Sequence, residues 1–289
     1  MNMQYQNAKI DLDLNAYIRM ALSEDIQEGD HSSLSSIPYN SMGKGKCLVK
    51  ADGVLAGVEL AKRIYKIVDP TLKIKVLKKD GAKVKYGDIA FYVEGRDQSI
   101  LTGERLVLNF MQRMSGIATL TNQFVAKCKG SKTKVLDTRK TTPGLRYFEK
   151  WAVRIGGGTN HRFGLYDMIM LKDNHVDYAG GIKKAILGAN KYLKEKNLKI
   201  KIEIETRNLD EVKQVLKVGK VDRIMLDNFT PDEIVTALKV IKGKFETEAS
   251  GGITLDTISA YAKTGVDYIS VGALTHSYHS MDISLKAVK

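Results

Sequence analysis

Basic side chains gather between Asp137 and His175, where the chain reads DTRKTTPGLR, then GGGTNHR, then LKDNH. The cations stand beside Gly, Pro, Thr and Asn, which belong to turns and loops. Arginine binds carboxylate or phosphate through two parallel hydrogen bonds, and lysine acts as a point charge. Cationic loops between buried strands indicate a site for a small, multiply anionic molecule. The basic residues are Arg139, Lys140, Arg146, His161, Arg162, Lys172 and His175.

For any one of these cations, a surface salt bridge is the ordinary alternative. A shared site requires that the cations near strand ends converge on one face. His161 is expected to donate a hydrogen bond, and His175 is expected to support Lys172. No Ser/His/Asp or Cys/His nucleophile set accompanies them.

Two acidic residues, Glu205 and Asp227, end predicted strands and oppose the loop cations in charge. Glu203 lies two positions before Glu205, so we expect it on the same side of the strand. Paired acids can hold ribose hydroxyls or a magnesium ion with its waters, or stabilise a cationic sugar carbon during glycosyl transfer. Structural neutralisation of nearby Arg and Lys is the alternative, and the two interpretations are compatible.

Glycine-rich loops follow the last two predicted strands, as Ser250-Gly251-Gly252 and as Gly272 with Ala273. In barrels these two loops often form a phosphate site, with backbone N–H groups aimed at oxygen. A helix beginning after Gly252 would add its positive end. Glycine can also serve only as a turn, so it is the position on the last strands that favours phosphate.

Short apolar strands alternate with helical segments after Ser115-Gly116, which is the candidate domain boundary. The predicted strands are Lys134–Leu136, Met168–Leu171, Ile200–Ile204, Arg223–Leu226, Thr247–Ala249 and Tyr268–Val271. The predicted helices are Gly181–Leu193, Leu209–Leu216, Pro231–Ile241 and Leu255–Lys263. Repeated strand–helix units imply parallel strands with helical crossovers.

Each predicted strand delivers a polar residue or glycine to its carboxyl end. In a βα-barrel these ends share the face on which such enzymes place their chemistry. An open doubly wound sheet also binds ligands at strand ends, but the first strand–helix turn here lacks GxGxxG. The pattern favours a complete or partial barrel. The terminal residues are Asp137, Lys172, Glu205, Asp227, Ser250 and Gly272.

The first part of the chain is predicted to be mixed α/β. Apolar residues recur at helical spacing from Leu14 to Leu22. The stretch Leu101–Cys128 is predicted to be largely helical, with an interruption at Ser115-Gly116. From periodicity alone, Arg105 is an exposed residue of an amphipathic core helix. Further elements are a helix at Gly57–Val68 and strands at GKCLVKADG, Leu72–Leu77 and Ile89–Val93.

The composition of the 289 residues, 43% hydrophobic, is that of a soluble globular protein. No run of about 18 apolar residues predicts a membrane span, and the N-terminus lacks an apolar signal core. Cys47 and Cys128 match no metal or disulfide spacing. A protein with such isolated cysteines fits a reducing compartment, so we expect it in the cytoplasm. A net charge of +13 permits nucleic-acid binding. Scattered lysines without interleaved aromatics or a nucleic-acid motif argue against it.

At these residues the chain resembles the quinolinate phosphoribosyltransferases, also called carboxylating nicotinate-nucleotide pyrophosphorylases. The similarity spans nearly the whole chain, and its middle block is highly specific. Departures from the family pattern are minor. Gln27 stands where the family usually has Gly, Trp151 where an aromatic such as Tyr is common, and Ile155 where Cys is frequent. The dipeptide Thr206-Arg207 after the acidic strand is a further departure. The matching segments are ALSEDIQEGDHSS, ERLVLNFMQRMSGIATLT, DTRKTTPGLR, AVRIGGGTNHRFGLYDMIMLKDNH, IEIE, IMLDNF, EASGGI and ISVGALTHS.

The resemblance implies an α/β fold in which an N-terminal α/β sandwich, residues 1–116, precedes an incomplete parallel α/β barrel, residues 117–275. A C-terminal tail, 276–289, is expected to pack back on the first domain. The resemblance also implies a homodimer, or a hexamer built from such dimers. The N-terminal domain of one subunit would cap the barrel of the other, so that Arg105 would reach into the partner's site.

The implied reaction transfers phosphoribosyl from phosphoribosyl pyrophosphate to quinolinate with Mg²⁺. Its products are nicotinate mononucleotide, pyrophosphate and CO₂, on the de novo route to NAD. The expected catalytic residues are Lys140, Lys172, Glu205 and Asp227. The expected quinolinate-binding residues are Arg105, Thr138, Arg139, Lys140, His161, Arg162 and Lys172. Phosphoribosyl pyrophosphate is expected at Glu205, Asp227, Ser250, Gly251, Gly252 and Gly272, with Mg²⁺ at the two acids, directly or through water.

Other functions remain open. A related pyrophosphorylase of the same fold could act on another aromatic acid. Nicotinate, with its single carboxylate, would leave some of the cations unpaired. A nucleic-acid-binding protein is an alternative from a different class. Specific binding to nucleic acid would persist at physiological salt, whereas non-specific attraction would be lost when salt is added.

Overall fold

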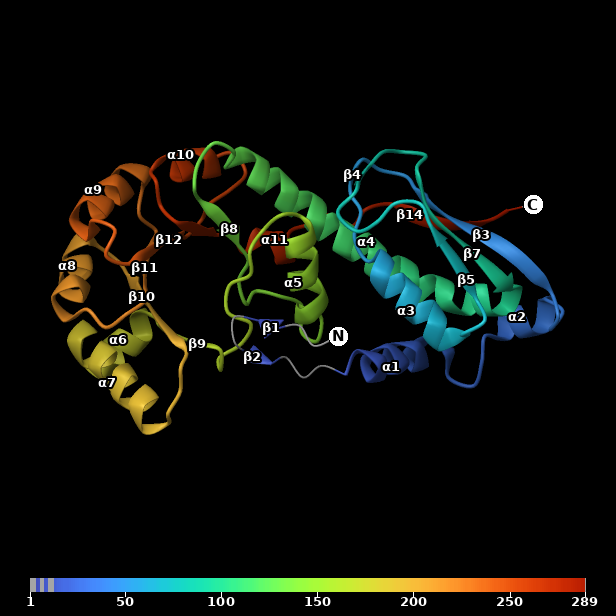
Figure 1. Cartoon of the computed structure of the whole chain (residues 1–289), viewed down its shortest axis with the longest axis horizontal. Coiled ribbons are helices and arrows are strands. Elements are labelled where there is room, and N and C mark those ends of the chain that lie inside the picture. The colour runs from blue at the N-terminus through green and yellow to red at the C-terminus, as the bar shows by residue number, and fades with distance from the viewer. Residues whose placement is uncertain (1–3, 6–7, 10–12, 289) are drawn as a thin grey trace. The chain divides into compact units, whose positions relative to one another are not determined.

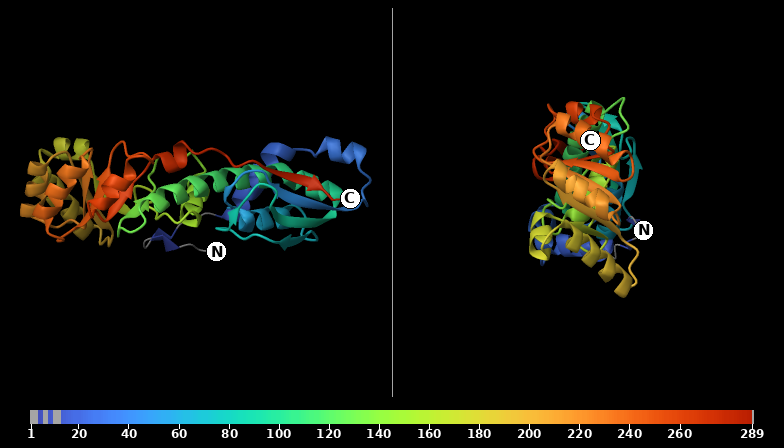
Figure 2. Two further views of the ribbon diagram at one scale, coloured as in Figure 1. Left: turned by 90° about the horizontal axis from the view of Figure 1, so that it is seen from above. Right: turned by 90° about the vertical axis from the view of Figure 1, so that its left-hand side faces the viewer.

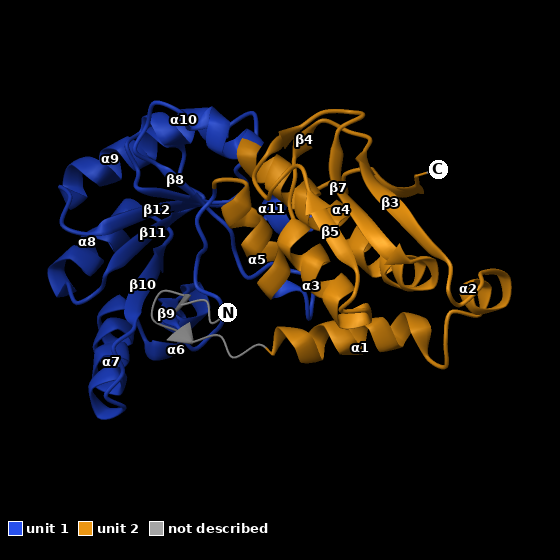
Figure 3. Cartoon of the chain, turned by 45° about the vertical axis from the view of Figure 1, so that its right-hand side comes forward, with its two compact units in different colours: residues 1–10, 123–146, 158–276 blue, residues 11–122, 147–157, 277–289 orange. Residues whose placement is uncertain are grey.

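The structure is a computed structural model that describes residues 4–5, 8–9 and 13–288. The chain divides into two compact units, which Figure 3 colours separately. Unit 1 comprises residues 1–10, 123–146 and 158–276, and unit 2 comprises residues 11–122, 147–157 and 277–289. The units interleave along the sequence, and a single domain boundary at 116/117 stays a prediction.

Unit 1 is built on a six-stranded parallel sheet with the strand order β8-β13-β12-β11-β10-β9. In the described part of the chain, β8 and β9 are edge strands that do not pair with each other, although Thr159 forms a parallel bridge to Leu136 of β8. The predicted incomplete parallel barrel is therefore confirmed. Its strands are β8 Lys134–Leu136, β9 Met168–Leu171, β10 Lys201–Thr206, β11 Arg223–Asp227, β12 Glu246–Ser250 and β13 Tyr268–Ser270. Short strands β1 Gln4–Tyr5 and β2 Ala8–Lys9 pair separately.

Helices connect the strands and cover the outer face of the curved sheet (Figure 1). The left panel of Figure 2 shows the yellow and orange helices on one side of the strands. Apolar residues at alternate strand positions, such as Ile202 and Ile204, are buried on this outer face. The helices of unit 1 are α6 Asp173–Ala179, α7 Ile182–Glu195, α8 Leu209–Val218, α9 Pro231–Ile241, α10 Ile258–Lys263 and α11 Ala273–His276.

The observed bounds refine the sequence prediction in a way that matters for the site. Strands β8 and β9 and helix α9 have the predicted bounds, but β10, β11 and β12 run further. Glu205, Asp227 and Ser250 are therefore terminal parts of strands, not residues of the loops that follow. Helix α6 was not predicted. It begins directly after Lys172, whose backbone N–H donates to Nδ1 of His175 at 3.0 Å and caps the helix.

Unit 2 contains a four-stranded antiparallel sheet with the order β14-β3-β7-β5, so the mixed α/β prediction is confirmed. Its C-terminal strand β14 pairs with β3. The strands are β3 Met42–Val49, β5 Lys73–Val76, β7 Ile89–Arg96 and β14 Ile283–Ala287, with β4 Gly53–Val54 and β6 Lys83–Val84 as a separate pair. The helices are α1 Leu14–Ile26, α2 His31–Ser36, α3 Val58–Val68, most of α4 Asp97–Lys127 and most of α5 Arg146–Ile155.

The predicted interruption of the long helix at Ser115-Gly116 is wrong, because α4 is continuous through both residues. Oγ of Ser115 donates to the Ala56 carbonyl at 3.1 Å and accepts from the Ala56 N–H at 2.9 Å. A side chain at Gly116 would collide with the carbonyl oxygen of His279. The two small residues therefore permit close packing on α4, and they do not break it. No helix in the described residues is long and apolar enough to cross a membrane.

Candidate active site

A cavity of about 800 Å³ lies at the carboxyl ends of the unit 1 strands. It is lined from all six strands or from the loops that follow them. Every predicted site residue of unit 1 lines it: Thr138, Arg139, Lys140, His161, Arg162, Lys172, Glu205, Asp227, Ser250, Gly251, Gly252 and Gly272. The cations near the strand ends therefore converge on one face, as a shared anion site requires.

Strand register explains why these side chains meet. Glu205 of β10 lies opposite Met225 of β11, and Asp227 follows Met225 by two positions on the same face. Asp227 in turn lies opposite Ser250 of β12. The polar residues at the ends of neighbouring strands therefore point into one space. Apolar residues between them, such as Ile224 and Leu226, are buried on the other face.

The loop after β8 presents Arg139 and Lys140 to the cavity, and both are exposed. The loop is braced from two sides. Oγ1 of Thr275 donates to the Lys140 carbonyl at 2.7 Å. Arg146 donates to the carbonyl of Arg139 at 3.4 Å and to that of Phe163 at 3.1 Å. Arg146 therefore holds the loop, whereas Arg139 and Lys140 face the ligand space.

Arg162 supplies a second guanidinium to the cavity from a buried position, 6% exposed. Its Nη1 donates to the Met168 carbonyl at 3.2 Å. Burial, followed by the like charge of Arg139, lowers the pKa of Arg162 below its usual value. Two arginines close enough to repel each other at one cavity wall favour an anion between them.

Lys172 and Glu205 form an ion pair at the ends of β9 and β10, with Nζ 3.0 Å from Oε2. Glu205 is buried and Lys172 is about half exposed. The structural interpretation of the acids, neutralisation of a nearby cation, is therefore realised for Glu205. On the next strand, Oδ2 of Asp227 accepts from Nδ2 of Asn228 at 2.7 Å.

The carboxylates of Glu205 and Asp227 also fit a magnesium site. They lie on adjacent strands, point to the same face and line the same cavity. Magnesium takes oxygen ligands, keeps several waters, and is commonly held by one or two carboxylates together with substrate phosphates. Two acids that face one cavity match the protein part of that donor set.

The loop after β12 is a turn built from two glycines with positive φ. Gly251 has φ +101°, and a side chain there would collide with the Asn228 side chain and lie 2.9 Å from its backbone nitrogen. Gly252 has φ +59° and faces open space. The expected helix does not begin directly after Gly252, because α10 starts at Ile258. The turn thus offers backbone N–H groups without an adjoining helix end.

His161 lies under the cavity and is 4% exposed. Its Nε2 is 2.9 Å from Oε2 of Glu203 and 3.3 Å from Oε2 of Glu248. Burial opposes the charged ring, but the carboxylates of Glu248 and Glu203 prevail and raise the pKa of His161 to about 10. The ring and its carboxylates therefore retain a proton at neutral pH. Its expected hydrogen bond to substrate stays a prediction.

Sequence reasoning placed Glu203 correctly on the side of Glu205 but overlooked Glu248 and Arg223. The signal was present as a two-residue period: Arg223, Met225 and Asp227 of RIMLD share one face of β11, Glu246, Glu248 and Ser250 of ETEAS share one face of β12, and all of them except Met225 are polar. Arg105 is an exposed residue of α4 and belongs to unit 2, whereas all the other predicted site residues belong to unit 1.

A barrel with two arginines, paired acids and a glycine turn at its strand ends defines a class of enzymes that bind sugar phosphates and anionic partners. Comparison with known families is more specific. Residues 117–286 match the family model "Quinolinate phosphoribosyl transferase, C-terminal domain", and residues 30–115 match the N-terminal domain of the same family. The chain belongs to the quinolinate phosphoribosyltransferase family.

Individual relatives agree with this family. A protein of Arabidopsis thaliana named nicotinate-nucleotide pyrophosphorylase [carboxylating], chloroplastic, is 48% identical, over 95% of this chain and 82% of its own length. A Bacillus subtilis protein, a probable nicotinate-nucleotide pyrophosphorylase [carboxylating], is 41% identical over 95% of this chain and 93% of its own. The crystal structure of NadC from Streptococcus pyogenes superposes with a TM-score of 0.91 at 38% identity, covering 97% of this chain and all of that one.

The glycine turn generates a matched pair of variants. Gly251→Ala adds a clash with Asn228 to a left-handed backbone, so we expect it to lower the free energy of unfolding by about 3 kcal/mol. Gly252→Ala meets no neighbour and should cost only about 1 kcal/mol. Urea unfolding of both variants measures the difference. Equal losses would show that Asn228 does not confine the turn.

Proposed function

We propose that this chain transfers phosphoribosyl from phosphoribosyl pyrophosphate to quinolinate and decarboxylates the product to nicotinate mononucleotide, in NAD biosynthesis. The observation that carries the proposal is one cavity that joins two arginines and two lysines to paired acids and a glycine turn. Quinolinate brings two adjacent carboxylates, and the cosubstrate brings a phosphate, a pyrophosphate and ribose hydroxyls. Each of these groups has a complementary partner there.

Quinolinate is assigned to the cationic wall. Arg139 and Arg162 bind its carboxylates by their planar forks, with Thr138 and His161 beside them. Lys140 and Lys172 neutralise the remaining negative charge. A substrate with one carboxylate, such as nicotinate, would leave part of this charge unpaired, which is why the dicarboxylate is preferred.

Phosphoribosyl pyrophosphate is assigned to the opposite strand ends. Glu205 and Asp227 hold its ribose hydroxyls, and the turn at Ser250, Gly251 and Gly252, with Gly272, binds the 5′-phosphate through backbone N–H groups. The two acids would also hold Mg²⁺, whose chemistry when bound is to offset the charge of the pyrophosphate group.

The reaction then follows from position and charge. The ring nitrogen of quinolinate attacks the anomeric carbon, and the carbon–oxygen bond to pyrophosphate breaks with its electron pair on oxygen. Glu205 and Asp227 stabilise the positive charge that develops on the sugar. The pyridinium nitrogen so formed stabilises the electron pair left on the neighbouring ring carbon when CO₂ departs, and a proton takes its place. No nucleophilic side chain is required, because positioning supplies much of the acceleration.

A subunit arrangement is part of the proposal. A second copy of the chain would supply Arg105 to the cavity, in a homodimer. The exposure of Arg105 on α4 supports this. The buried thiols of Cys47 and Cys128 support a reducing compartment such as the cytoplasm.

One assay tests the function directly. Quinolinate labelled in the carboxylate that is lost should release labelled CO₂ only when phosphoribosyl pyrophosphate is present. The Lys172→Ala variant, with an unchanged melting temperature, should release little. If nicotinate or another aromatic acid were converted while quinolinate was not, the choice of substrate would be wrong.

The role of Arg139 can be measured separately. Arg139→Ala removes a fork whose charge-assisted hydrogen bond contributes roughly 1.5–3 kcal/mol, so quinolinate affinity should fall about tenfold or more. Arg207→Ala is the matched control, because Arg207 directly follows β10 but pairs with Asp177 and Glu211 outside the cavity. Calorimetry that finds the same quinolinate affinity in Arg139→Ala and the wild type would remove Arg139 from the site.

Sharing between subunits predicts complementation. An Arg105→Ala subunit mixed with a Lys172→Ala subunit should regain activity, because one of the two hybrid sites contains both native residues. Each variant alone should be nearly inactive. Verified heterodimers that remain inactive would mean that Arg105 does not act on a partner's cavity.

A further inference from the structure

A second cavity, of about 320 Å³, lies at the amino ends of the unit 1 sheet strands. Five of the six sheet strands place their first residue against this basal cavity. Among the described residues, none lines both the basal cavity and the proposed substrate cavity, so the two are separate. The five first residues are Lys134 of β8, Met168 of β9, Lys201 of β10, Arg223 of β11 and Tyr268 of β13.

The basal cavity is the lowest layer of the barrel interior. Arg223 precedes Met225 of the substrate cavity by two positions on β11, so both side chains face inward. In most barrels bulky apolar side chains fill such inward layers. This layer instead carries three cations, a tyrosine and, on β12, Glu246. It is therefore not an ordinary apolar filling.

Glu246 is fully engaged by its neighbours in this layer. Its carboxylate lies 3.1 Å from Nζ of Lys201 and 3.3 Å from Nη2 of Arg223. The Tyr268 hydroxyl also donates to it at 3.2 Å. Glu246 therefore offsets charge within the layer and has little capacity for the remaining cations.

Two further lysines of the basal cavity have no carboxylate to balance them. Lys134 and Lys199 are exposed, and neither forms an ion pair in the part of the chain that the structure describes. Asp167 also lines the cavity, but its carboxylate accepts the backbone N–H groups of Phe163 at 2.6 Å and Gly164 at 2.8 Å. The cavity therefore has an excess of positive charge at its rim.

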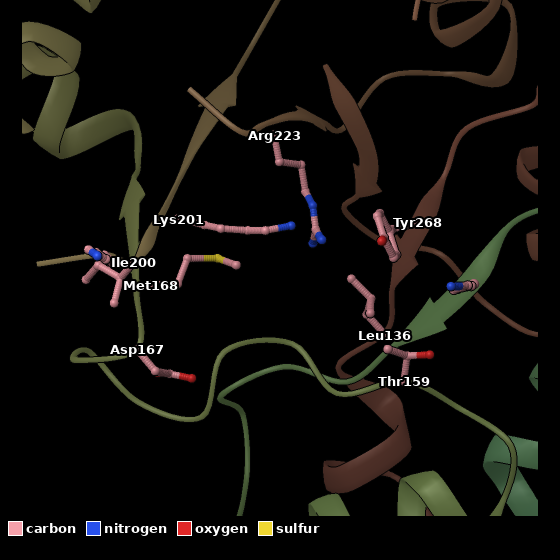
Figure 4. A pocket seen from close by; sticks show the side chains of 10 residues that line it. Leu136, Thr159, Asp167, Met168, Ile200, Lys201, Arg223 and Tyr268 are labelled. Atoms are coloured by element: carbon pink, nitrogen blue, oxygen red, sulfur yellow. The ribbon is translucent and has the colours of Figure 1, made fainter. Parts of the chain in front are cut away.

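Arg223 adds a buried guanidinium to the wall of the cavity. Its side chain is 5% exposed, and Cζ lies 3.9 Å from the centre of the Tyr268 ring. Figure 4 shows Arg223 reaching into the cavity beside Lys201 and Tyr268. Nη1 pairs with Glu248 at 2.8 Å, but Nε has no hydrogen-bond partner among the described residues. Since a guanidinium presents five N–H groups, part of its donor capacity is unused.

Apolar side chains complete the lining of the basal cavity. Leu136 and Met168 are buried, and Ile200 is partly exposed. Ligand pockets are mostly apolar with a few placed polar groups, and they span about 300–1,000 Å³. A volume of about 320 Å³ is at the small end of that range. The lining therefore fits a compact molecule with an apolar body and an anionic group.

Lysines at this end of a barrel could instead offset the negative carboxyl ends of the helices. The spacing argues against that role. Helix α7 ends at Glu195 and helix α4 ends at Lys127, so Lys199 and Lys134 both stand beyond the last turn of the preceding helix. The influence of a helix dipole falls off within that last turn. The observations therefore favour a ligand.

We propose that the basal cavity is a second ligand site, which binds a small phosphate monoester with an apolar body. The body lies against Leu136 and Met168, and the phosphate lies at Lys134 and Lys199. A phosphate monoester carries roughly −1.5 to −2 charge at pH 7, which matches two lysines without acid partners. Arg223 adds a buried positive charge behind them. Because the two cavities share no described lining residue, binding there does not depend on the proposed reaction.

A crystal soaked with 4-bromophenyl phosphate tests the location, because bromine scatters anomalously. The wild type should show a bromine peak in the basal cavity, and Lys134→Ala/Lys199→Ala should lose it. The control is Lys217→Ala/Lys239→Ala, which removes two likewise exposed lysines from α8 and α9 and should keep the peak. A wild-type basal cavity without a peak, or a peak that survives Lys134→Ala/Lys199→Ala, would overturn the proposal.

Calorimetry at low salt measures the same binding in solution, where exposed charges are little screened. Affinity for 4-bromophenyl phosphate should fall about tenfold or more in Lys134→Ala/Lys199→Ala, because two charge-assisted contacts are lost. It should be retained in Lys172→Ala, whose substitution lies in the other cavity. If Lys172→Ala removes the binding and Lys134→Ala/Lys199→Ala does not, the molecule occupies the substrate cavity and the proposal is wrong.

Two further molecules test the class of ligand. Inorganic phosphate lacks the apolar body and 4-bromobenzoate carries a single charge, so each should bind at least about fivefold more weakly than 4-bromophenyl phosphate. Equal affinity for either would contradict a phosphate monoester with an apolar body. Lys134→Ala/Lys199→Ala should also keep the wild-type melting temperature. A lower melting temperature with unchanged affinity would assign the two lysines a structural role and overturn the proposal.

Discussion

The two-residue period of the parallel strands determines nearly everything that unit 1 does. Along β10, β11 and β12, buried apolar residues such as Ile204, Ile224 and Ala249 face the helices, and most of the residues that face the interior are charged. A barrel interior is more often filled with branched apolar side chains, so this one must balance its charges among themselves. The position of a residue along its strand then determines whether it pairs inside the barrel or lines the cavity. Arg223 and Glu248 neutralise each other inside, whereas Asp227 and Ser250, at the strand ends, line the ligand cavity.

This arrangement links stability to recognition. Several residues that we propose to bind a ligand lie at the ends of strands whose lower positions form ion pairs. Lys172 and Glu205 show the transition, since they pair with each other and also line the cavity. Binding of an anion would bring new partners to Lys172 and free Glu205 for a sugar hydroxyl or a metal. The charges of Lys172 and Glu205 therefore balance each other in the structure, so not every charged residue of the site needs a ligand as its partner.

Much of the site could be predicted from local chemistry. Cations among turn residues, acids at strand ends and a regular strand–helix alternation were enough to place the loop residues on one face, because parallel strands end together. Glu248 and Arg223 were overlooked for a physical reason. The strand ETEAS was predicted only over Thr247–Ala249, and because these residues are mostly polar, the inward face that carries Glu248 was not followed. The break expected in α4 failed because Ser115 and Gly116 allow close packing there. Contributions from a second chain have no signature in the spacing of residues.

A structure with quinolinate and an unreactive analogue of phosphoribosyl pyrophosphate bound together tests the central claim most directly. The account predicts the two carboxylates of quinolinate between Arg139 and Arg162, above His161. It also predicts the ribose hydroxyls at Glu205 and Asp227, with the 5′-phosphate on the Gly251–Gly252 turn. Quinolinate bound away from the two arginines, or the phosphate bound away from the glycine turn, would contradict it.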